Sequence, residues 1–258
     1  GDEVIVSTWT MCASATAILH WNAIPVFADI DKKTFNIDPK SVEANIKPQT
    51  KAILAIDIFG QSCDIKELRR IANKYNLKLI TDTAQAPGAF HFNDSTGTLA
   101  DVGGFSLNYH KHIHTGEGGV LVTNDSDIYE KLLLIRNHGE AVVHAKGVNQ
   151  INNTFGYNFR LGEIECAIGI EQLKKLSKII ESKQEIGNLL TAGLKKLEGL
   201  TTPYIDEGNT HVYYVYPIIL NIKSLGVSRA KIVEALTAEG IEGLCDGYIN
   251  VHMLPMYQ

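Results

Sequence analysis

The sequence predicts an α/β fold with a mostly parallel sheet that is flanked by helices. Short runs of β-branched residues alternate with segments of helical periodicity in the first half of the chain. A well-marked amphipathic helix begins near Asp64, between two of these runs. Strands separated by helices of this length require right-handed crossovers, which produce a parallel sheet covered on both faces.

Six segments have the length and composition of strands. They are Val4–Val6, Pro25–Ala28, Ala52–Phe59, Leu77–Thr81, Val102–Ser106 and Val120–Thr123. Ligands of such sheets bind beyond the carboxyl ends of the strands. Because Asp82 and Ser106 both fall at predicted strand ends, we expect the sheet to bring them together.

Two helix starts carry clear capping signals. Asp64 is a predicted N-cap, since Glu67 follows three residues later and an apolar face comes next. Asp38 precedes Pro39, a residue that is favoured at the first helical position. Both starts lie between predicted strands, as an alternating fold requires.

The second half of the chain is more helical. One long helix is expected after Gly162, with a kink near Gly187. A strand around Val212–Ile222 and a helix over Ser228–Glu239, closed by Gly240, should follow in a smaller α+β domain. The long helix would then link two domains.

Composition excludes several classes of protein. With 258 residues, of which 45% are hydrophobic, the chain can bury a full core. A net charge of -5 provides no basic field, so no nucleic-acid partner is expected. No apolar run approaches the length of about 18 residues that a membrane span needs, and the start does not resemble a signal peptide. The four cysteines form no C-x-x-C pair, which indicates buried free thiols and a cytoplasmic protein.

Lys111 is the most informative residue, because glycines and histidines surround it between Gly104 and Gly119. A lysine in a polar loop is ordinarily solvated. A lysine that forms a Schiff base must instead be neutral part of the time, and burial beside other cations lowers its pKa. His110 and His112 would supply such cations when charged.

Asp82 provides the acid that would complement this amine. A carboxylate that keeps a pyridine nitrogen protonated turns the ring into a strong electron sink, so the pair predicts pyridoxal phosphate as cofactor. Gln85 lies close enough to meet the phenolic oxygen of the ring, and Ser106 can donate to the phosphate. Each has a plainer alternative: a turn-capping aspartate, a loop glutamine and a strand serine bonded to the backbone.

The order of motifs resembles the DegT/DnrJ-type (StrS-like) sugar aminotransferases, which are pyridoxal phosphate enzymes of fold type I, the aspartate aminotransferase fold. The motifs are Gly1-Asp-Glu-Val-Ile-Val6, Asp82-Thr-Ala-Gln-Ala86, Phe105-Ser106 with Lys111, Thr115-Gly-Glu-Gly-Gly119 and Gly156-Tyr-Asn-Phe-Arg160. Each motif alone is weak, whereas the ordered set is specific and spans nearly the whole chain.

The resemblance implies a role for each site residue. Lys111 would bond covalently to the cofactor and later carry the proton, Asp82 would pair with the pyridinium, Gln85 with the phenolic oxygen and Ser106 with the phosphate. Asn158 would reach the phosphate bound by a neighbouring subunit, so a homodimer with shared active sites is expected. Without the family, Asn158 is an ordinary turn residue.

Several positions depart from the family pattern. Met11 stands where many members carry an aromatic residue that stacks on the cofactor, so its thioether, or the nearby Trp9, is expected to cover that face. His252 matches a family segment near the substrate, although a lone histidine is more often structural. Relatives extend beyond both ends of this sequence. We expect residues 1–170 to form the cofactor-binding domain without its first segment, and residues 171–258 the linking helix and an incomplete small domain.

The predicted reaction moves an amino group from glutamate or glutamine to a keto-sugar, nucleotide-linked, for a surface polysaccharide or an antibiotic. Two alternatives remain at this stage. His110, His112 and His114 alternate along the chain, so on a strand they would share a face and bind a metal with Glu117. The chain could also be a non-catalytic or dehydrating relative that binds the same cofactor. Dehydrating members carry histidine in place of the Schiff-base lysine, so Lys111 favours amino transfer.

Overall fold

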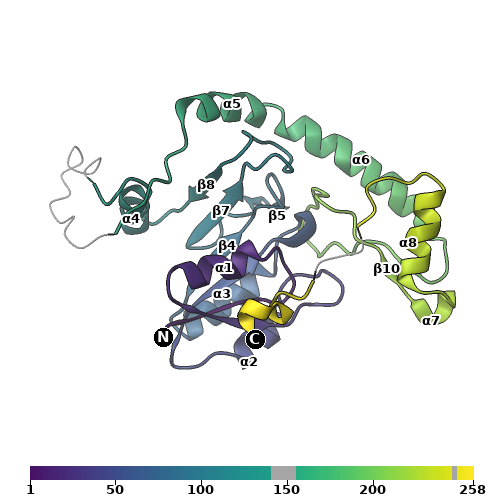
Figure 1. The fold of residues 1–258 in the computed structure, drawn as a ribbon, viewed down its shortest axis with the longest axis horizontal. Helices are drawn as coiled ribbons and strands as arrows, with labels where there is room; N and C mark the ends of the chain where they lie inside the picture. The colour runs from purple at the N-terminus through teal and green to yellow at the C-terminus, as the bar shows by residue number, and fades with distance from the viewer. Residues whose placement is uncertain (141–154, 246–248) are drawn as a thin grey trace.

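The computed structural model describes residues 1–140, 155–245 and 249–258, and its centre is a six-stranded sheet. The strand order is β2-β1-β3-β4-β7-β8, with the β7–β8 pair antiparallel and every other pair parallel. The strands are β1 (Glu3–Ser7), β2 (Ile24–Ala28), β3 (Thr50–Ile56), β4 (Lys78–Asp82), β7 (Val102–Ser106) and β8 (Gly119–Val122). The predicted α/β class and mostly parallel mixed sheet are confirmed (Figure 1).

Helices cover both faces of this sheet. On one face, Ile5 and Ile53 pack in a buried cluster with Leu68 of α3 (Ile65–Lys74) and Val42 of α2 (Pro39–Ala44). On the other face, Val6 packs with Ala15 of α1 (Ala13–His20). Ile5 and Val6 are neighbours that point to opposite faces, because side chains alternate along a strand. Because both faces of β1 are buried, its sequence has a continuous run of apolar residues and not an alternating pattern.

The predicted caps of α2 and α3 are present. The Asp64 side chain accepts a hydrogen bond from the Glu67 amide at 3.2 Å, and Asp38 accepts one from the Lys40 amide at 2.9 Å. Both bonds satisfy amide groups that the first turn of a helix leaves without a partner. The two sequence signals therefore marked the starts of these helices correctly.

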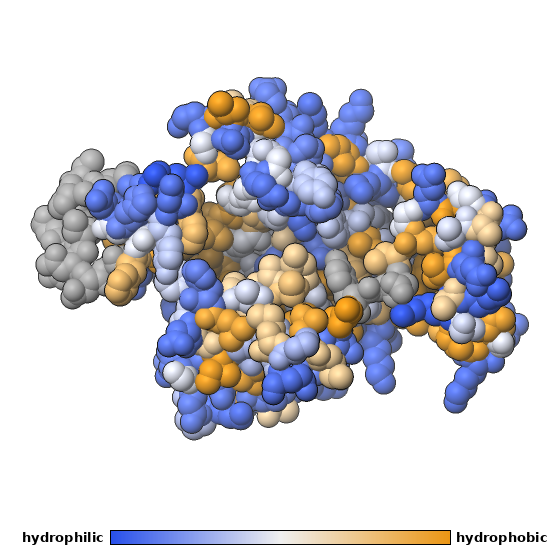
Figure 2. Space-filling model, in the orientation of Figure 1, coloured by the Kyte–Doolittle hydropathy of each residue, from blue (hydrophilic) through white to orange (hydrophobic). Residues whose placement is uncertain are grey.

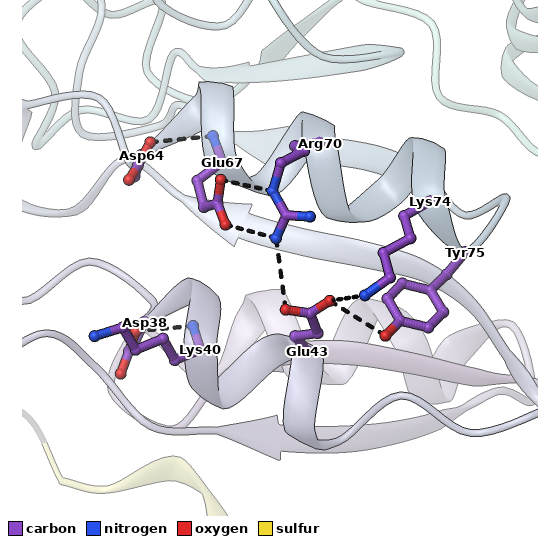
Figure 3. Close-up of polar contacts among 8 residues, drawn as sticks. All are labelled: Asp38, Lys40, Glu43, Asp64, Glu67, Arg70, Lys74 and Tyr75. Carbon is purple, nitrogen blue, oxygen red and sulfur yellow. Dashed lines mark hydrogen bonds and ion pairs between the residues drawn. The ribbon is translucent and has the colours of Figure 1, made fainter.

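Charged side chains connect α2 to α3 on the surface (Figure 3). Glu43 of α2 accepts from Lys74 at 2.7 Å and from the Tyr75 hydroxyl at 3.2 Å, and it pairs with Arg70 at 3.5 Å. Such exposed pairs contribute little to stability, because water and salt screen their charges. The cluster orients α2 against α3 and has no connection to the site described below.

Three shorter elements and one helix complete the first half. A 3-10 turn over Ile58–Gly60 follows β3, and a small hairpin joins β5 (Phe90–His91) to β6 (Asp94–Ser95). Helix α4 (Ser126–Arg136) follows β8. The predicted strand over Ala52–Phe59 therefore ends three residues early, since the chain turns after Ile56.

The expected single long helix is two helices, α5 (Glu163–Leu173) and α6 (Leu176–Leu194). They separate at Lys174 and Lys175, where the Lys175 amide bonds to the carbonyl of Gln172, and not near Gly187. Gly187 lies inside α6, at a point where the helix packs against Tyr213. A methyl group at this position would meet the Tyr213 ring at 2.6 Å. This glycine permits close packing and does not kink the helix.

A smaller unit follows α6, drawn at the right of Figure 1. It pairs β9 (Leu200–Thr201) with β10 (Ile219–Leu220) and includes α7 (Ile222–Leu225) and α8 (Arg229–Ala238). The predicted helix after Ser228 is confirmed, with the serine as its N-cap and Gly240 in the left-handed region at φ 86°.

The predicted strand around Val212–Ile222 is wrong over most of its length. Only β10 forms there, because residues 211–216 run back to the large sheet, where the Val212 amide donates to the carbonyl of Gly60 at 2.8 Å. Two 3-10 turns, Val251–Met253 and Pro255–Tyr257, also return to this sheet, and the Val251 amide donates to Thr8. The division into two domains at residue 170 stays a prediction.

The cysteines are free, as predicted, but the predicted burial is confirmed for Cys63 alone. Cys63 is buried, Cys166 is half-buried, and Cys12 and Cys245 are exposed. Among the described residues, no helix combines the length and the apolar character that a transmembrane segment requires.

Candidate active site

The site lies where β4 and β7 end. These neighbouring parallel strands pair Asp82 with Gly104, so Ser106 lies two residues further along the adjacent strand. The Thr83 amide donates to the Gly104 carbonyl at 2.8 Å and continues the pairing beyond β4. The sheet thus brings Asp82 and Ser106 to the same edge, as the strand pattern predicts.

Hydrogen bonds hold the Asp82 carboxylate at this edge. The hydroxyl of Ser14, in the first turn of α1, donates to Oδ2 at 2.7 Å, and the Ala84 amide donates to Oδ1 at 3.1 Å. A carboxylate oxygen accepts more than one bond, so the group can still receive a ligand N–H. Ser14 gave no signal in the sequence, because only the packing of α1 on the sheet brings it to Asp82.

Asn108 organises the loop that carries Lys111. Its carbonyl accepts from the Lys111 amide at 2.9 Å, and its side chain accepts from the His110 amide and donates to Glu117. Its own amide donates to the Ser106 hydroxyl oxygen at 3.2 Å. The loop therefore has a defined shape, and Ser106 still carries a hydroxyl proton that a phosphate oxygen can accept.

Lys111 is half-buried, and its amine is in the electrostatic field of Asp82. Burial lowers the pKa of Lys111 below its ordinary value, while the negative charge of Asp82 opposes that change. The amine lies 4.5 Å from the centre of the Tyr214 ring. Charged histidines were expected to lower this pKa, but burial accounts for the change. The lysine is not a solvated loop residue.

Gln85 is buried in the turn after β4, and its side chain bonds to the backbone. Its side-chain oxygen accepts from the Phe59 amide at 2.8 Å. The amide nitrogen is the donor end of this side chain, which suits the predicted contact with a phenolic oxygen. That contact stays a prediction.

Met11 and Trp9 differ in their surroundings. Trp9 packs against Phe35 and Phe59, with ring centres 5.0 and 5.7 Å apart. Met11 is 54% exposed just before α1, and its sulfur accepts from the Ala13 amide at 3.2 Å. Because Trp9 is part of an aromatic cluster, Met11 is the better candidate to cover a bound ring.

Asn158 lies in the segment before α5, and His252 lies in the 3-10 turn Val251–Met253. Asn158 is exposed and pairs with Asn137 beyond the end of α4. His252 is half-buried, its ring 6.0 Å from that of Phe27, and its buried Nδ1 has no hydrogen-bond partner within the described residues. Their proposed roles toward a partner subunit and a substrate stay predictions.

The three alternating histidines do not form a metal site. His112 is buried and bonds through Nε2 to the Val212 carbonyl at 2.8 Å, while His110 and His114 are exposed. In residues 1–140, 155–245 and 249–258, no group of three or more His, Cys, Asp or Glu side chains has metal-binding geometry. The loop does not continue β7, so the histidines never share one face.

Asp57 is a second buried acid beside the site. It accepts from the Thr83 hydroxyl at 2.7 Å and from the Cys63 amide at 2.9 Å. Its complete burial, with a smaller contribution from the charge of Asp82, raises the pKa of Asp57 to about 6. Sequence analysis missed this residue, which supports the turn after β4 through Thr83.

The fold places this protein with the fold type I transferases, a class whose members use pyridoxal phosphate. The model of the DegT/DnrJ/EryC1/StrS aminotransferase family matches residues 1–258, and the chain belongs to that family. The sequence-based resemblance is thereby confirmed.

Several curated relatives match the whole of this chain. A GDP-perosamine synthase of Vibrio cholerae is 35% identical over 260 residues, which cover 68% of its own length. An L-glutamine:2-deoxy-scyllo-inosose aminotransferase of Streptoalloteichus tenebrarius is 34% identical over 265 residues and is covered to 62%.

Solved structures agree with this placement. PseC of Helicobacter pylori, an aminotransferase of pseudoaminic acid biosynthesis, is 30% identical with a TM-score of 0.88; the match covers 100% of this chain and 68% of PseC. A GDP-4-keto-6-deoxymannose-3-dehydratase is 31% identical with a TM-score of 0.84; the match covers 94% of this chain and 65% of the dehydratase. The chain spans about two thirds of the length of these relatives.

Proposed function

We propose that this chain belongs to a pyridoxal phosphate-dependent aminotransferase that moves an amino group from glutamate or glutamine to a nucleotide-linked keto-sugar. The product would serve amino-sugar biosynthesis, for a surface polysaccharide or an antibiotic. The observation that carries the proposal is the half-buried Lys111 amine, with its lowered pKa, in the field of Asp82. The names of the GDP-perosamine synthase and of the glutamine-dependent relative support the substrate and donor classes.

The groups at the site suit pyridoxal phosphate. An amine with a lowered pKa is more often neutral, as condensation with an aldehyde requires. Asp82 is held by two donors and retains acceptor capacity toward a pyridinium N–H. Ser106 offers a hydroxyl proton at the adjacent strand end. Lys111, Asp82, Gln85 and Ser106 would hold the cofactor, with Met11 over one face of its ring.

Each residue then has a distinct task. When bound, pyridoxal phosphate accepts the amino group and withdraws electrons from the carbon that bears it. Asp82 keeps the ring nitrogen protonated through a charge-assisted bond of about 1.5–3 kcal/mol. Lys111, once displaced by the amino donor, moves the proton from the α-carbon of that donor. A positioned acid–base group of this kind contributes typically 10²–10⁴-fold to the rate. Gln85 and Ser106 would help to orient the ring and its phosphate group.

Dehydration of the sugar is the alternative reaction, because a dehydratase is among the similar solved structures. Dehydration leaves the amine out of the sugar product, whereas transamination incorporates it. Lys111 can return a proton to the carbon that receives the amino group, and this favours transamination. Incubation with a nucleotide-linked keto-sugar and ¹⁵N-glutamate separates the two reactions, because only transamination transfers ¹⁵N to the sugar.

The cofactor assignment is tested by trapping. We expect pyridoxal phosphate to give a yellow adduct that borohydride fixes to the peptide carrying Lys111. Lys111→Ala should abolish both the label and turnover. Lys66→Ala is the control, because Lys66 lies over the Phe92 ring at 4.0 Å, outside the site. A label on another lysine, or transamination by Lys111→Ala, would contradict the assignment. A metal protein would instead lose its function with a chelator.

A homodimer with shared sites is part of the proposal. Helix α5 has no buried residue and exposes Ile164, Ile170 and Leu173, by 75%, 60% and 61%. Figure 2 shows a group of hydrophobic residues at the top of the view, where α5 lies in Figure 1. A groove of about 510 Å³ lies beside it, lined by Glu117, Arg160 and their neighbours. A second copy would cover this apolar surface and bring its Asn158 to the phosphate.

The cytoplasm is the proposed compartment. Its support is the set of four unpaired cysteines, because oxidising compartments favour disulfides. Alkylation of the protein in intact cells, before lysis, would test this directly. Thiols that resist alkylation until a disulfide reductant is added would contradict a reducing compartment.

A further inference from the structure

Residues 211–216 lie about one hundred positions after Lys111 in the chain. They contact both parts of the site: the turns that hold Gln85 near Asp82, and the loop that carries Lys111. On the acid side, the Val212 amide donates to the Gly60 carbonyl at 2.8 Å, and the Val215 amide donates to the Phe59 carbonyl at 3.3 Å. Phe59 in turn donates its own amide to Gln85. The segment is thereby connected to the turn that follows β4.

On the amine side, the same segment is fixed through His112. The Nε2 of this ring donates to the Val212 carbonyl at 2.8 Å. Burial lowers the pKa of His112, so the ring is neutral near neutral pH with its proton on the bonded nitrogen. His211 is also buried and accepts from the Tyr213 amide at 3.0 Å through Nδ1. These bonds define the backbone on both sides of Tyr214.

Tyr214 presents its ring to the Lys111 amine. The distance from Nζ to the ring centre is 4.5 Å, within the range of a cation–π contact. The ring is half-buried, and burial raises the pKa of its hydroxyl, so the phenol stays neutral near neutral pH. The electron-rich face of a neutral ring attracts an ammonium group. The ring therefore favours the protonated form of the Lys111 amine over the neutral form.

We propose that Tyr214 is a positioning residue of the site, whose ring holds the Lys111 amine beside Asp82 and stabilises its protonated form. The proposal rests on the proposed function in taking Lys111 as the reacting amine. Burial alone would lower the fraction of charged Lys111, and the ring opposes that effect. The other charge that acts on this amine is that of Asp82 at the end of β4, while Lys111 and Lys183 of α6 both lower the pKa of the adjacent His112.

The test measures the pKa of Lys111 in protein freed of cofactor. Acetylation by trace acetic anhydride is followed against pH, and the peptide carrying Lys111 is quantified by mass spectrometry. Tyr214→Leu keeps an apolar, buried neighbour and removes the ring, so we expect the measured pKa to fall by about 0.5. At a pH below that pKa, Lys111 should then react about three times faster. Tyr214→Phe keeps the ring and should match the parent protein.

The matched control is Tyr204→Leu, because Lys33 lies 5.3 Å from the centre of that ring, and this change should leave Lys111 unaltered. An unchanged or higher pKa of Lys111 in folded Tyr214→Leu would overturn the proposal. Should the leucine variant fail to fold, Tyr214→Met provides the same comparison. This assay contains no cofactor, so its outcome is independent of the borohydride trapping experiment. Failure of trapping at Lys111 would reject the proposed function but would leave the measured effect of Tyr214 on the pKa of Lys111 unchanged.

Discussion

The hydroxyl of Ser14 donates a 2.7 Å hydrogen bond to Oδ2 of Asp82, across 68 positions of the chain. Ser14 is buried in the first turn of α1, and Asp82 ends β4 in the centre of the sheet. The packing of α1 on the sheet therefore determines the orientation of the carboxylate. A cofactor that bonds to this carboxylate depends on a helix that does not itself carry a predicted site residue.

Removal of the Ser14 hydroxyl should weaken cofactor binding. Ser14→Ala leaves Asp82 with one fewer donor, and a hydrogen bond to a charged group is worth about 1.5–3 kcal/mol. We expect the dissociation constant for pyridoxal phosphate, measured by absorbance titration, to rise by about 10-fold or more. Ser224→Ala, whose hydroxyl faces Glu198 at 3.5 Å, should bind as the parent does. Equal affinity of the Ser14→Ala protein would show that the bond has no role in binding.

Stability should depend on the ionisation of Asp57. Burial, aided by the charge of Asp82, raises its pKa from 3.8 to about 6, so the folded protein binds this proton more tightly than the unfolded chain does. The stability that the folded protein gains from holding this proton is fully present below 3.8, the pKa of Asp57 in the unfolded chain. It is lost as the pH rises through about 6, the pKa of Asp57 in the folded protein. Asp57→Asn removes the charge and can keep both hydrogen bonds. The asparagine oxygen accepts from the Cys63 amide, and its NH₂ group donates to the Thr83 hydroxyl, which turns to accept. Its stability relative to the parent should improve by roughly 2 kcal/mol between pH 4.5 and 7.5.

Urea unfolding of the two proteins at a series of pH values measures this difference. Other titrating groups contribute equally to both proteins and cancel in the comparison. A difference in unfolding free energy that stays constant across the range would show that Asp57 has an ordinary pKa in the folded state.

Two glycines of α6 should respond to alanine in opposite directions. A methyl group at Gly193 meets nothing within 4 Å, so Gly193→Ala should stabilise the protein by about 0.5–1 kcal/mol through helix propensity. A methyl group at Gly187 meets the Tyr213 ring at 2.6 Å, so Gly187→Ala should destabilise it by about 1–3 kcal/mol. Urea unfolding measures both changes. Stabilisation by Gly187→Ala would contradict the close packing of α6 on Tyr213.

Shared active sites predict complementation between two inactive variants. Lys111→Ala and Asn158→Ala should each lose most activity alone. In a mixed dimer, one site would combine Lys111 from one chain with Asn158 from the other. Renatured equimolar mixtures should therefore recover about one quarter of the parent activity, since half of the dimers are mixed and each has one intact site. No recovery would indicate that each site is built from a single chain.

The positions of Lys111 and Asp82 could be predicted because their signals are local. Asp82 follows a short β-branched run that forms a strand in many contexts, and Lys111 follows another such run by a few residues. Parallel pairing of these two strands then brings their ends together without further information. The alternation of strand and helix patterns was enough for the fold class, and the order of the motifs was enough for the family.

Ser14, Asp57 and Tyr214 could not be predicted, because nothing in their immediate sequence marks them. Ser14 reaches Asp82 only through the packing of a helix, and Tyr214 meets Lys111 across about one hundred positions. Gly187 was misread for a related reason. A glycine within a helical pattern indicates either a kink or a close contact, and the neighbouring ring of Tyr213 decides between them.

The sequence alone determined the alternation of strands and helices, the caps of α2 and α3, and the family to which the chain belongs, since these depend on periodicity and on motifs a few residues long. Tertiary structure decided the direction of the Asp82 carboxylate, the burial of Lys111 and the path of residues 211–216. These features arise from contacts between residues far apart in the chain, whose free energies depend on packing and on exclusion of water and are not encoded in any local pattern.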